Sequence, residues 1–351
     1  MIHAPLPHHS IDFADDIPFY LYDPTKGLNS QEYSSSMVFW ASHPLQFFYP
    51  KGRFDPRLVE KDPLPSPTNY PSEFIIQHDI SQVRAVRIFL RTHFGTPPDK
   101  PTFDIPESDL LGPQDHVMIV RDKSGEIAGC IRYHYLGKFV TQDLIYCVDC
   151  FCIHPRWRKK GVGDYLLTQL HIFVNQNNIP YSIFLKEGPS LSILSSPHGS
   201  GVYVYRALTR VKPSSQIQYL SMEQAHRLLE IHRQFRPDTF MILHTDRIRQ
   251  HWILWRHNTE HVLACVQDTY QRKGSRKMGW ITAWMESPSL ALREEASKEI
   301  ADACYPMFDD LWMNRLWVGD SKEWTMDGGF HWYLYQWETY IPMGRSYAIL
   351  T

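Results

Sequence analysis

The stretch that decides the fold is residues 147–176, CVDCFCIHPRWRKKGVGDYLLTQLHIFVNQ, which predicts a strand, a basic glycine loop and an amphipathic helix in succession. The apolar residues at 148–153 indicate a buried strand, and Pro155 ends it because proline cannot continue a strand ladder. Apolar residues after the loop recur at helical spacing, so one face of the following helix is expected to pack on a sheet. These residues are Val162, Leu166, Leu170 and Phe173.

The loop between the strand and the helix, residues 158–163, reads RKKGVG. Glycines at a helix start let backbone N–H groups approach a ligand closely, and these groups, the helix dipole and three cationic side chains suit a pyrophosphate. The loop resembles the R-x-x-G-x-G signature of the CoA-dependent N-acetyltransferase superfamily (GNAT). The alternative is a surface turn with solvated charges.

The bulk composition narrows the class of protein. A chain of 351 residues exceeds the usual single domain, so we expect two units or one large composite. A hydrophobic content of 43% is ample for a packed core. A charged fraction of 21% and a net charge of −2 argue against a dedicated nucleic-acid binder or a strongly basic membrane binder.

The cysteines indicate whether the chain binds a metal ion, and the N-terminus indicates the cellular compartment. On an extended strand Cys150, Cys152 and His154 point one way and Cys147 the other, so one continuous strand cannot wrap a tetrahedral ion with them. We therefore expect reduced, buried thiols and no metal. The start of the chain, MIHAPLPHHSIDF, has no signal-peptide pattern, and no window approaches the roughly 20 apolar residues of a membrane span. We expect a soluble, cytoplasmic monomer.

The remaining elements extend this reading to the whole chain. The first part predicts an irregular arm, then a helix at 80–93 and strands at 116–120, 127–136 and 181–185. Helix, antiparallel strands, strand–loop–helix and strand is the order of the first half of a GNAT domain, a mixed sheet flanked by helices.

The pattern partly recurs in the second part of the chain. It predicts helices at 222–231, 246–254 and 292–303, and strands at 261–267, 278–285 and 330–340. No glycine loop lies between Trp284 and Leu292, so a degenerate second copy is favoured over a second CoA site. We predict an α/β fold with a mixed (α+β) sheet, in which two pseudo-symmetric GNAT-like halves form one compact unit. Its parts are an arm at 1–72, an acyl-CoA-binding half at 73–210, and a second half at 211–351 with a peptide groove and a buried C-terminus.

Four segments resemble, in the same order, motifs of the protein N-myristoyltransferase family. FWASHPL at 39–45 is similar to F-W-x-T-Q-P-V, and FCIH at 151–154 with the following 158–160 is similar to F-L-C-V-H-x-x-L-R-S-K-R. GSGVYVYRAL at 199–208 is similar to G-T-C-R-Y-x-H-R-x-L, and DGGFHWYLYQW at 327–337 to D-G-x-L-x-Y-Y-L-Y-N-W.

The resemblance implies transfer of a C14 acyl group from myristoyl-CoA to the α-amine of an N-terminal glycine. The thioester oxygen then needs preorganised donors, and the glycine ammonium must lose a proton before it attacks. By register, the donors are the backbone amides of Cys150 and Phe151. The base is the C-terminal carboxylate, which in this chain is that of Thr351. The partners are N-terminal glycine peptides or proteins, with no nucleic acid and no stable membrane insertion.

The resemblance also implies binding residues. Those for myristoyl-CoA are Met37, Val38, Phe39, Trp40, Cys152, Ile153, Arg158, Lys159, Lys160, Gly161, Val162 and Gly163. Those for the peptide are Phe103, Asp149, Gly188, Tyr203, Tyr205, Asp327, Gly328 and Leu350. For each aromatic residue the alternative is core packing, and Asp327 with Gly328 equally suits a turn.

Departures from the family pattern leave the substrate open. The loop at 95–100 holds one acid and one base where the family carries an acidic run, and Lys186-Glu187-Gly188 stands where it has T-A-G. Asp149 replaces an asparagine. Two other functions therefore remain as alternatives, a short-chain CoA-dependent N-acetyltransferase and a catalytically silent module that binds acyl-CoA or acylated peptides.

Overall fold

The computed structural model describes residues 57–58, 75–78, 82–94, 102–139, 144–179, 181–190, 197–243, 250–288, 290–335, 337–339, 341 and 343–350. Every structural statement below concerns these residues. The predicted sites at Met37, Val38, Phe39, Trp40 and Thr351 lie outside them.

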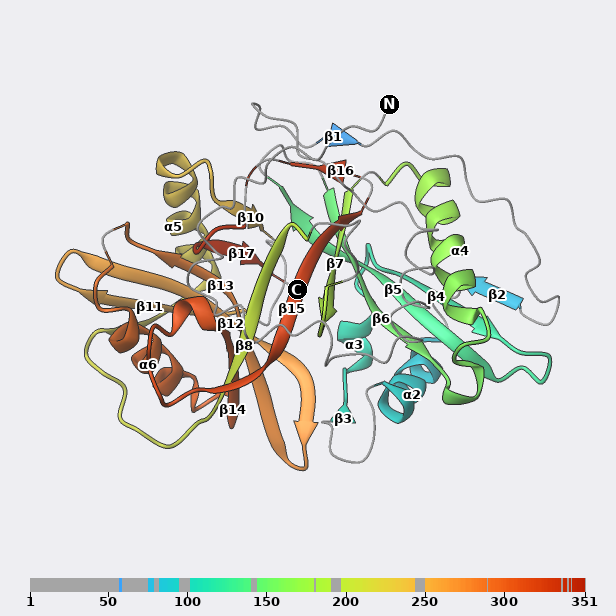
Figure 1. Ribbon diagram of the computed structural model, residues 1–351, viewed down its shortest axis with the longest axis horizontal. Coiled ribbons are helices and arrows are strands. Elements are labelled where there is room, and N and C mark those ends of the chain that lie inside the picture. The colour runs from blue at the N-terminus through green and yellow to red at the C-terminus, as the bar shows by residue number, and fades with distance from the viewer. Residues whose placement is uncertain are drawn as a thin grey trace.

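One mixed sheet runs through the whole molecule (Figure 1). Its strands follow the order β2-β4-β5-β6-β7-β15-β8-β14-β13-β12-β11-β9, with β3, β10 and β17 attached beside this path. The elements of the first part are β2 (Ile75–His78), α2 (Val83–His93), β3 (Thr102–Phe103), α3 (Glu107–Leu110), β4 (His116–Arg121), β5 (Ile127–Lys138), β6 (Leu144–Ile153), η3 (Pro155–Trp157), α4 (Val162–Gln176), β7 (Tyr181–Glu187) and β8 (Gly199–Ala207).

The second part repeats this plan. Its elements are β9 (Ile217–Leu220), α5 (Met222–Phe235), β10 (Phe240–Ile242), β11 (His251–His257), β12 (Glu260–Lys273), β13 (Arg276–Glu286), α6 (Arg293–Cys304), β14 (Asp310–Asn314), η4 (Arg315–Trp317), β15 (Thr325–Tyr335), β16 (Trp337–Glu338) and β17 (Tyr347–Ile349). A short pair of β1 (Arg57–Leu58) with β16 stands apart from the main sheet.

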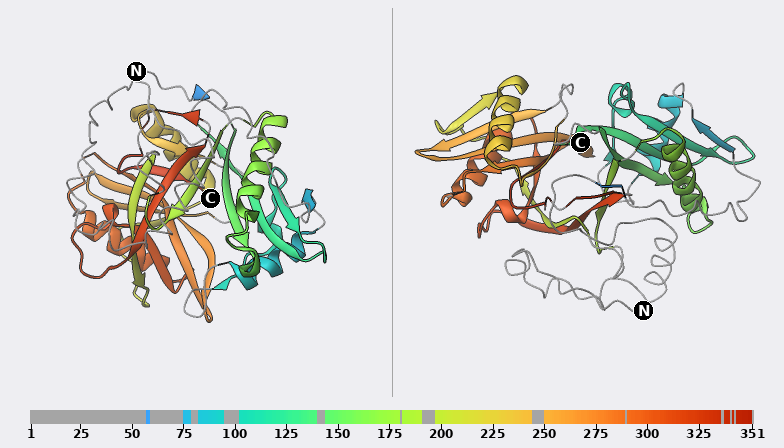
Figure 2. Two further views of the ribbon diagram at one scale, coloured as in Figure 1. Left: turned by 45° about the vertical axis from the view of Figure 1, so that its right-hand side comes forward. Right: turned by 90° about the horizontal axis from the view of Figure 1, so that it is seen from above.

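The strand order is symmetric about the β15–β8 pair. Each half has a three-stranded antiparallel meander followed by a parallel pair, β6–β7 in the first and β13–β14 in the second. The halves exchange their last strands, because β15 pairs with β7 and β8 pairs with β14. Seen from above, the two meanders spread to either side of these central strands (Figure 2). The predicted α/β fold with a mixed sheet built from two pseudo-symmetric halves is confirmed, whereas the limits 1–72, 73–210 and 211–351 stay a prediction.

Helices cover both faces of each meander. In the first half, Phe89 and Leu90 of α2 pack in one apolar cluster with Ile119 of β4, while Leu166 of α4 packs with Ile131 of β5 in another. In the second half, α5 and α6 divide the two faces in the same way. Strands covered on both faces are apolar almost throughout, which is what the sequence shows in these segments.

The helix predicted at 246–254 is wrong, because residues 251–257 form strand β11. Trp252 and Leu254 face the α5 cluster, and Ile253 and Trp255 face the α6 cluster. All four are buried, so the period-2 alternation that marks a one-sided strand is missing. Segment 244–249 is outside the described residues.

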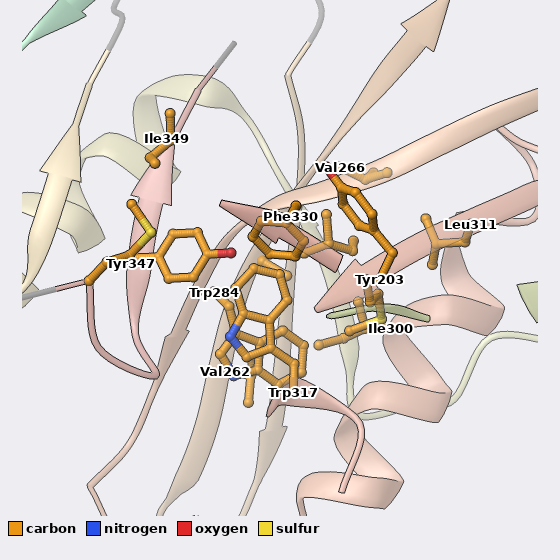
Figure 3. Close-up of a cluster of buried hydrophobic side chains, with 14 of the residues drawn as sticks. Tyr203, Val262, Val266, Trp284, Ile300, Leu311, Trp317, Phe330, Tyr347 and Ile349 are labelled. Atoms are coloured by element: carbon orange, nitrogen blue, oxygen red, sulfur yellow. The ribbon is translucent and has the colours of Figure 1, made fainter. Parts of the chain in front are cut away.

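Strand β17 lies inside the second half. It pairs in parallel with β10 and antiparallel with β13, where Ala348 lies opposite Ala283 and Tyr347 opposite Trp284. Figure 3 shows Tyr347 beside the stacked Trp284 and Trp317 rings, whose centroids are 5.7 Å apart. Leu350 is fully buried directly after this strand.

Candidate active site

A cavity of about 470 Å³ opens where the parallel strands β6 and β7 separate. Their pairing runs from Ile145 opposite Tyr181 to Val148 opposite Phe184, and both strands continue beyond it. The cavity occupies this fork. Its walls come from both halves of the molecule, so a ligand there would contact the first-half strands, α4 and the β12–β14 region together.

A β-bulge lies at the fork, at Cys150 and Phe151, and both residues line the cavity. The β5–β6 register passes from Arg132 opposite Asp149 to Cys130 opposite Cys152, so two residues of β6 face one of β5. Cys150 has a φ of 48°, a left-handed conformation that costs a non-glycine residue roughly 1–2 kcal/mol. Strain of this kind is concentrated at functional sites. The structure thus interrupts the ladder at the two predicted oxyanion donors.

The thiol of Cys150 is not a ready nucleophile. Burial, and then the charge of Asp149, raise the pKa of this thiol well above its usual range. A thiol held protonated at neutral pH does not attack a thioester. All six cysteines are buried with free thiols, as predicted. Among the described residues, no three His, Cys, Asp or Glu side chains come together as metal ligands would.

Arg132 and Asp149 form a bidentate ion pair in the cavity wall. The Arg132 Nε lies 2.6 Å from Asp149 Oδ1, and Nη2 lies 2.5 Å from Oδ2. The remaining nitrogen, Nη1, donates to the backbone carbonyls of Asp109 at 2.9 Å and Leu110 at 3.2 Å. Asp149 therefore meets a buried cation, and the pair ties the bulged strand to α3.

The predicted phosphate loop lies at the start of α4. Gly161, with a φ of 81°, is its N-cap, and Lys159 also takes a left-handed φ of 60°. Arg158, Lys159 and Lys160 are exposed. Arg158 Nε donates to the Ile153 carbonyl at 3.1 Å, which holds the loop against the end of β6. The loop thus gathers three cations around free helix-terminal amides.

Helix α4 connects this loop to the cavity. Leu167 and Leu170, further along the helix, line the cavity. Of the other residues predicted for CoA, Cys152 and Val162 are buried in the packing, while Ile153 and Gly163 are half-buried. None of these four lines the cavity in the described part of the chain.

The predicted peptide residues fall into three groups. Phe103, Asp149 and Tyr203 line the cavity. Gly188, with a φ of 78°, follows the lining residue Glu187, and its N–H donates to the Gly329 carbonyl at 2.8 Å.

The third group does not line the cavity. The hydroxyl of Tyr205 donates to Asp310 Oδ1 at 2.7 Å, and burial, followed by this bond, raises the pKa of Tyr205 to about 12. Asp327 and Gly328 are exposed, with Gly328 opposite Tyr203 at a register shift. Leu350 is fully buried in the α5-side cluster.

Sequence reasoning missed several lining residues. Tyr270 of β12 has a φ of 57°, and its hydroxyl donates to Asp109 Oδ2 at 2.7 Å, which joins the two halves across the cavity. Trp280, Trp312 and Trp332 also line it, although their strands read as ordinary core. Only the pairing of distant strands brings them together, and no local pattern reports that pairing.

The cavity lining holds four carboxylates and two cations, which are Asp109, Asp149, Glu187, Asp268, Arg132 and Lys186. Two of the carboxylates are neutralised by arginines, Asp149 by Arg132 and Asp268 by Arg272. Burial lowers the pKa of Lys186, whose Nζ donates to the carbonyls of Glu187 at 3.1 Å and Pro189 at 2.5 Å. None of the helices in the described ranges is both long and apolar enough to cross a membrane.

Comparison with known proteins first defines the class of domain. Residues 113–193 match the family model of the acetyltransferase (GNAT) domain. This segment contains the bulge, the loop and most of the first-half wall of the cavity. Comparison with the curated proteins gives no match.

Comparison with solved structures then shows which known fold the whole chain is similar to. Saccharomyces cerevisiae N-myristoyltransferase with bound myristoyl-CoA and inhibitors is 14% identical with a TM-score of 0.62, over 89% of this chain and 91% of that one. The same yeast enzyme with bound myristoyl-CoA gives 14% identity and a TM-score of 0.59, over 86% and 88%. The likeness confirms the predicted N-myristoyltransferase-like fold.

Proposed function

We propose that the protein is an acyltransferase that moves a myristoyl group from myristoyl-CoA to the α-amine of an N-terminal glycine. One observation carries this proposal: a single cavity joins the left-handed bulge at Cys150 and Phe151 to a wall supplied by the second half. An acyl donor held by the first half and an acceptor held by the second would meet at the bulge.

The donor side follows from the loop and from α4. Lys159, Lys160 and the amides after Gly161 are suited to the CoA pyrophosphate. The apolar side chains of Leu167, Leu170 and Phe184 line the cavity beyond the loop and are suited to an alkyl chain.

The chemistry at the bulge needs no metal in this proposal. The amine nitrogen bonds to the thioester carbon, the amides of Cys150 and Phe151 stabilise the oxyanion, and the carbon–sulfur bond then breaks to release CoA. The amine is a nucleophile only after its ammonium form loses a proton. The proposed acceptor of that proton is the carboxylate of Thr351, and Leu350 before it is fully buried.

The first experiment measures transfer by the full chain with acetyl-, octanoyl- and myristoyl-CoA and a glycine-initiated peptide. We expect the highest kcat/KM with myristoyl-CoA, and no product from the matched peptide that begins with N-acetylglycine. Faster transfer from acetyl-CoA would instead identify a short-chain N-acetyltransferase. Binding of acyl-CoA without any turnover would identify a silent binding module.

The second experiment tests the base. Two alanines appended after Thr351 displace its carboxylate, so we expect turnover to fall strongly while acyl-CoA binding persists. Undiminished turnover would remove this carboxylate from the mechanism.

The proposed compartment is the cytoplasm, because an enzyme that modifies protein N-termini would meet its substrates there.

A further inference from the structure

A second cavity, of about 620 Å³, lies in the second half between α5 and the β11–β12 hairpin, and we call it the α5 groove. In the described part of the chain, no residue lines both this groove and the candidate active site. Its volume falls within the roughly 300–1,000 Å³ that is typical of small-molecule sites. The proposed acyl transfer does not use it.

The floor of the α5 groove is apolar. Leu254 of β11, Leu263 of β12 and Met285 of β13 form it, and each is at most 3% exposed. Leu228 of α5 packs against the same cluster and completes the floor. These side chains match an alkyl chain, whereas an extended peptide would find no partners there for its backbone N–H and C=O groups.

Basic side chains gather at one end of the groove, where α5 ends and the hairpin turns. Arg256 and His261 lie opposite each other on the hairpin. His232 belongs to the last turn of α5, and Arg236 is the C-cap of this helix. Burial, followed by the charges of Arg236 and His261, lowers the pKa of His232 to about 4, so these groups lie near one another. All four residues line the groove and form its mouth.

The two carboxylates of the lining, Glu260 and Glu286, are engaged on the other face of the sheet. Glu260 accepts from the backbone N–H groups of Ala291 at 2.9 Å and Leu292 at 3.3 Å, just before α6. Glu286 forms a bidentate pair with Arg293, the first residue of α6, at 2.9 and 3.2 Å. Because α6 covers the face opposite α5, these carboxylates leave the mouth of the groove positive.

Arg256 is the cation of the mouth that is available to a ligand. Arg236 is paired with Asp238 at 3.2 and 3.4 Å, whereas the exposed Arg256 has no carboxylate partner within the described ranges. Arg256 extends from a strand, so it does not serve the dipole of α5 as a cation in the last helical turn does. A ligand carboxylate could accept a bidentate, charge-assisted bond from its guanidinium.

Two exposed apolar side chains flank the mouth. Ile231 and Phe235, one helical turn apart on α5, line the groove and are 48% and 78% exposed. A flat bilayer surface would reach these two rim residues but not the buried floor. A single alkyl chain can cover the floor and the rim together.

We infer that the α5 groove binds a long-chain fatty acid, with its alkyl chain on the apolar floor and its carboxylate at Arg256. Apolar surface and charge are both matched by this ligand, the chain through burial and the head group through the arginine. The inference does not rest on the proposed function, because the groove is separate from the candidate active site.

The first test is calorimetry of the full chain with octanoate, decanoate and dodecanoate, each below its micelle concentration. We expect affinity to rise about tenfold or more from octanoate to dodecanoate, because each buried methylene group adds to binding. Dodecyltrimethylammonium, which has the same tail and the opposite charge, should bind at least tenfold more weakly. Equal binding of this cation, or no binding of dodecanoate, would overturn the inference.

Variants then locate the site. Arg256→Gln should weaken dodecanoate binding about fivefold or more, Arg256→Lys should keep part of the affinity, and Ile231→Asp should weaken it by repelling the carboxylate. The matched controls are Arg227→Gln, at an exposed arginine of α5, and Ile88→Asp, at an exposed isoleucine of α2; neither residue lines the groove. Both should bind as the wild type does. Fatty acid held in the active-site cavity would not respond to Arg256→Gln, so an unchanged affinity in this variant would also overturn the inference.

Vesicles test the other occupant of such a surface. We expect the chain not to sediment with phosphatidylcholine vesicles, with or without phosphatidylserine. Sedimentation that requires phosphatidylserine and is lost in Arg256→Gln, in a chain that does not bind dodecanoate, would assign this face to a membrane and overturn the inference.

Discussion

Arg132 shows how one residue of the cavity wall can support the bulged strand. Its side chain is 7% exposed and ties Asp149, directly before the bulge, to the end of α3. Arg132→Met leaves a part-buried carboxylate, 29% exposed, without its partner, and we expect the free energy of unfolding to fall by about 2 kcal/mol, less than for a fully buried pair. In Arg132→Met/Asp149→Leu no charge remains, so most of the loss should be recovered. Urea unfolding of both singles and the double measures the coupling, and additive losses would contradict it.

Cys150 separates the use of a backbone amide from the use of a side chain. Cys150→Ala keeps the amide, so turnover should stay within about threefold of the wild type. Cys150→Val places a β-branched residue at a φ of 48°, which strains the bulge, and turnover should fall about tenfold or more. Cys130→Val, at a buried cysteine of the neighbouring strand with no predicted role in the site, is the control. A large loss in Cys150→Ala would point to the thiol instead of the amide.

Motif and register pointed to Cys150 and Phe151, and both line the cavity, while their role as oxyanion donors stays a prediction. Arg132 could not be found in this way. The local sequence does not show why an arginine stands in an apolar strand, because its ion-pair partner Asp149 is 17 residues away on the neighbouring strand. Trp280 and Trp312 likewise read as core until β13 and β14 are paired.

At the level of elements, the strand–loop–helix unit allows a matched test of the phosphate loop. Gly161 and Gly125 have φ values of 81° and 84°, and a Cβ added at either meets nothing within 4 Å. Alanine at either position should therefore cost a similar amount, about 1 kcal/mol. Only Gly161→Ala disturbs the amides at the start of α4. We expect it to weaken acyl-CoA binding several-fold in calorimetry, while Gly125→Ala does not, and equal affinities would remove Gly161 from the site.

Elements with a one-sided apolar pattern were predictable from sequence, whereas an apolar run buried on both faces is ambiguous between strand and helix: it was assigned correctly at β5 and wrongly at β11. Helix α4 begins at Val162, where the glycine loop and the helical spacing place it. Strand β11 was predicted as a helix because helices cover both of its faces. The exchange of β8 and β15 between the halves could not be predicted, because it depends on pairing between strands far apart in the sequence and leaves no local sequence pattern.

On the scale of the whole molecule, one buried and two half-buried histidines should make the fold sensitive to mild acid. Burial first, with nearby cations in the last two, lowers the pKa of His198 to about 3 and those of His232 and His331 to about 4. The unfolded chain protonates these residues near pH 6.5, so it binds more protons between about pH 6.5 and 4, and stability falls as the pH drops through this window. The urea midpoint should decrease from pH 7 to pH 5.

A histidine variant checks the origin of this slope. His232→Gln with His331→Gln should make the decrease shallower, because two of the titrating groups are gone. Asp115 does not interfere: burial raises its pKa, but the bond to His134 outweighs this and holds the pKa well below the usual range. Its stabilisation is therefore lost only below about pH 4. An unchanged slope would assign the acid sensitivity to other groups.

The exchanged strands also decide whether the halves are independent. In the full chain β15 covers the edge of β7, and β8 covers the edge of β14. A fragment of residues 1–210 would expose the edge of β7 and leave β8 without either neighbour. A fragment of 211–351 would leave β15 without either neighbour and β14 with only β13. We expect neither fragment alone to give native circular dichroism, the two co-expressed to reassemble, and the intact chain to unfold in one transition. A folded 1–210 fragment that binds acyl-CoA would show instead that the exchange joins two halves already stable by themselves.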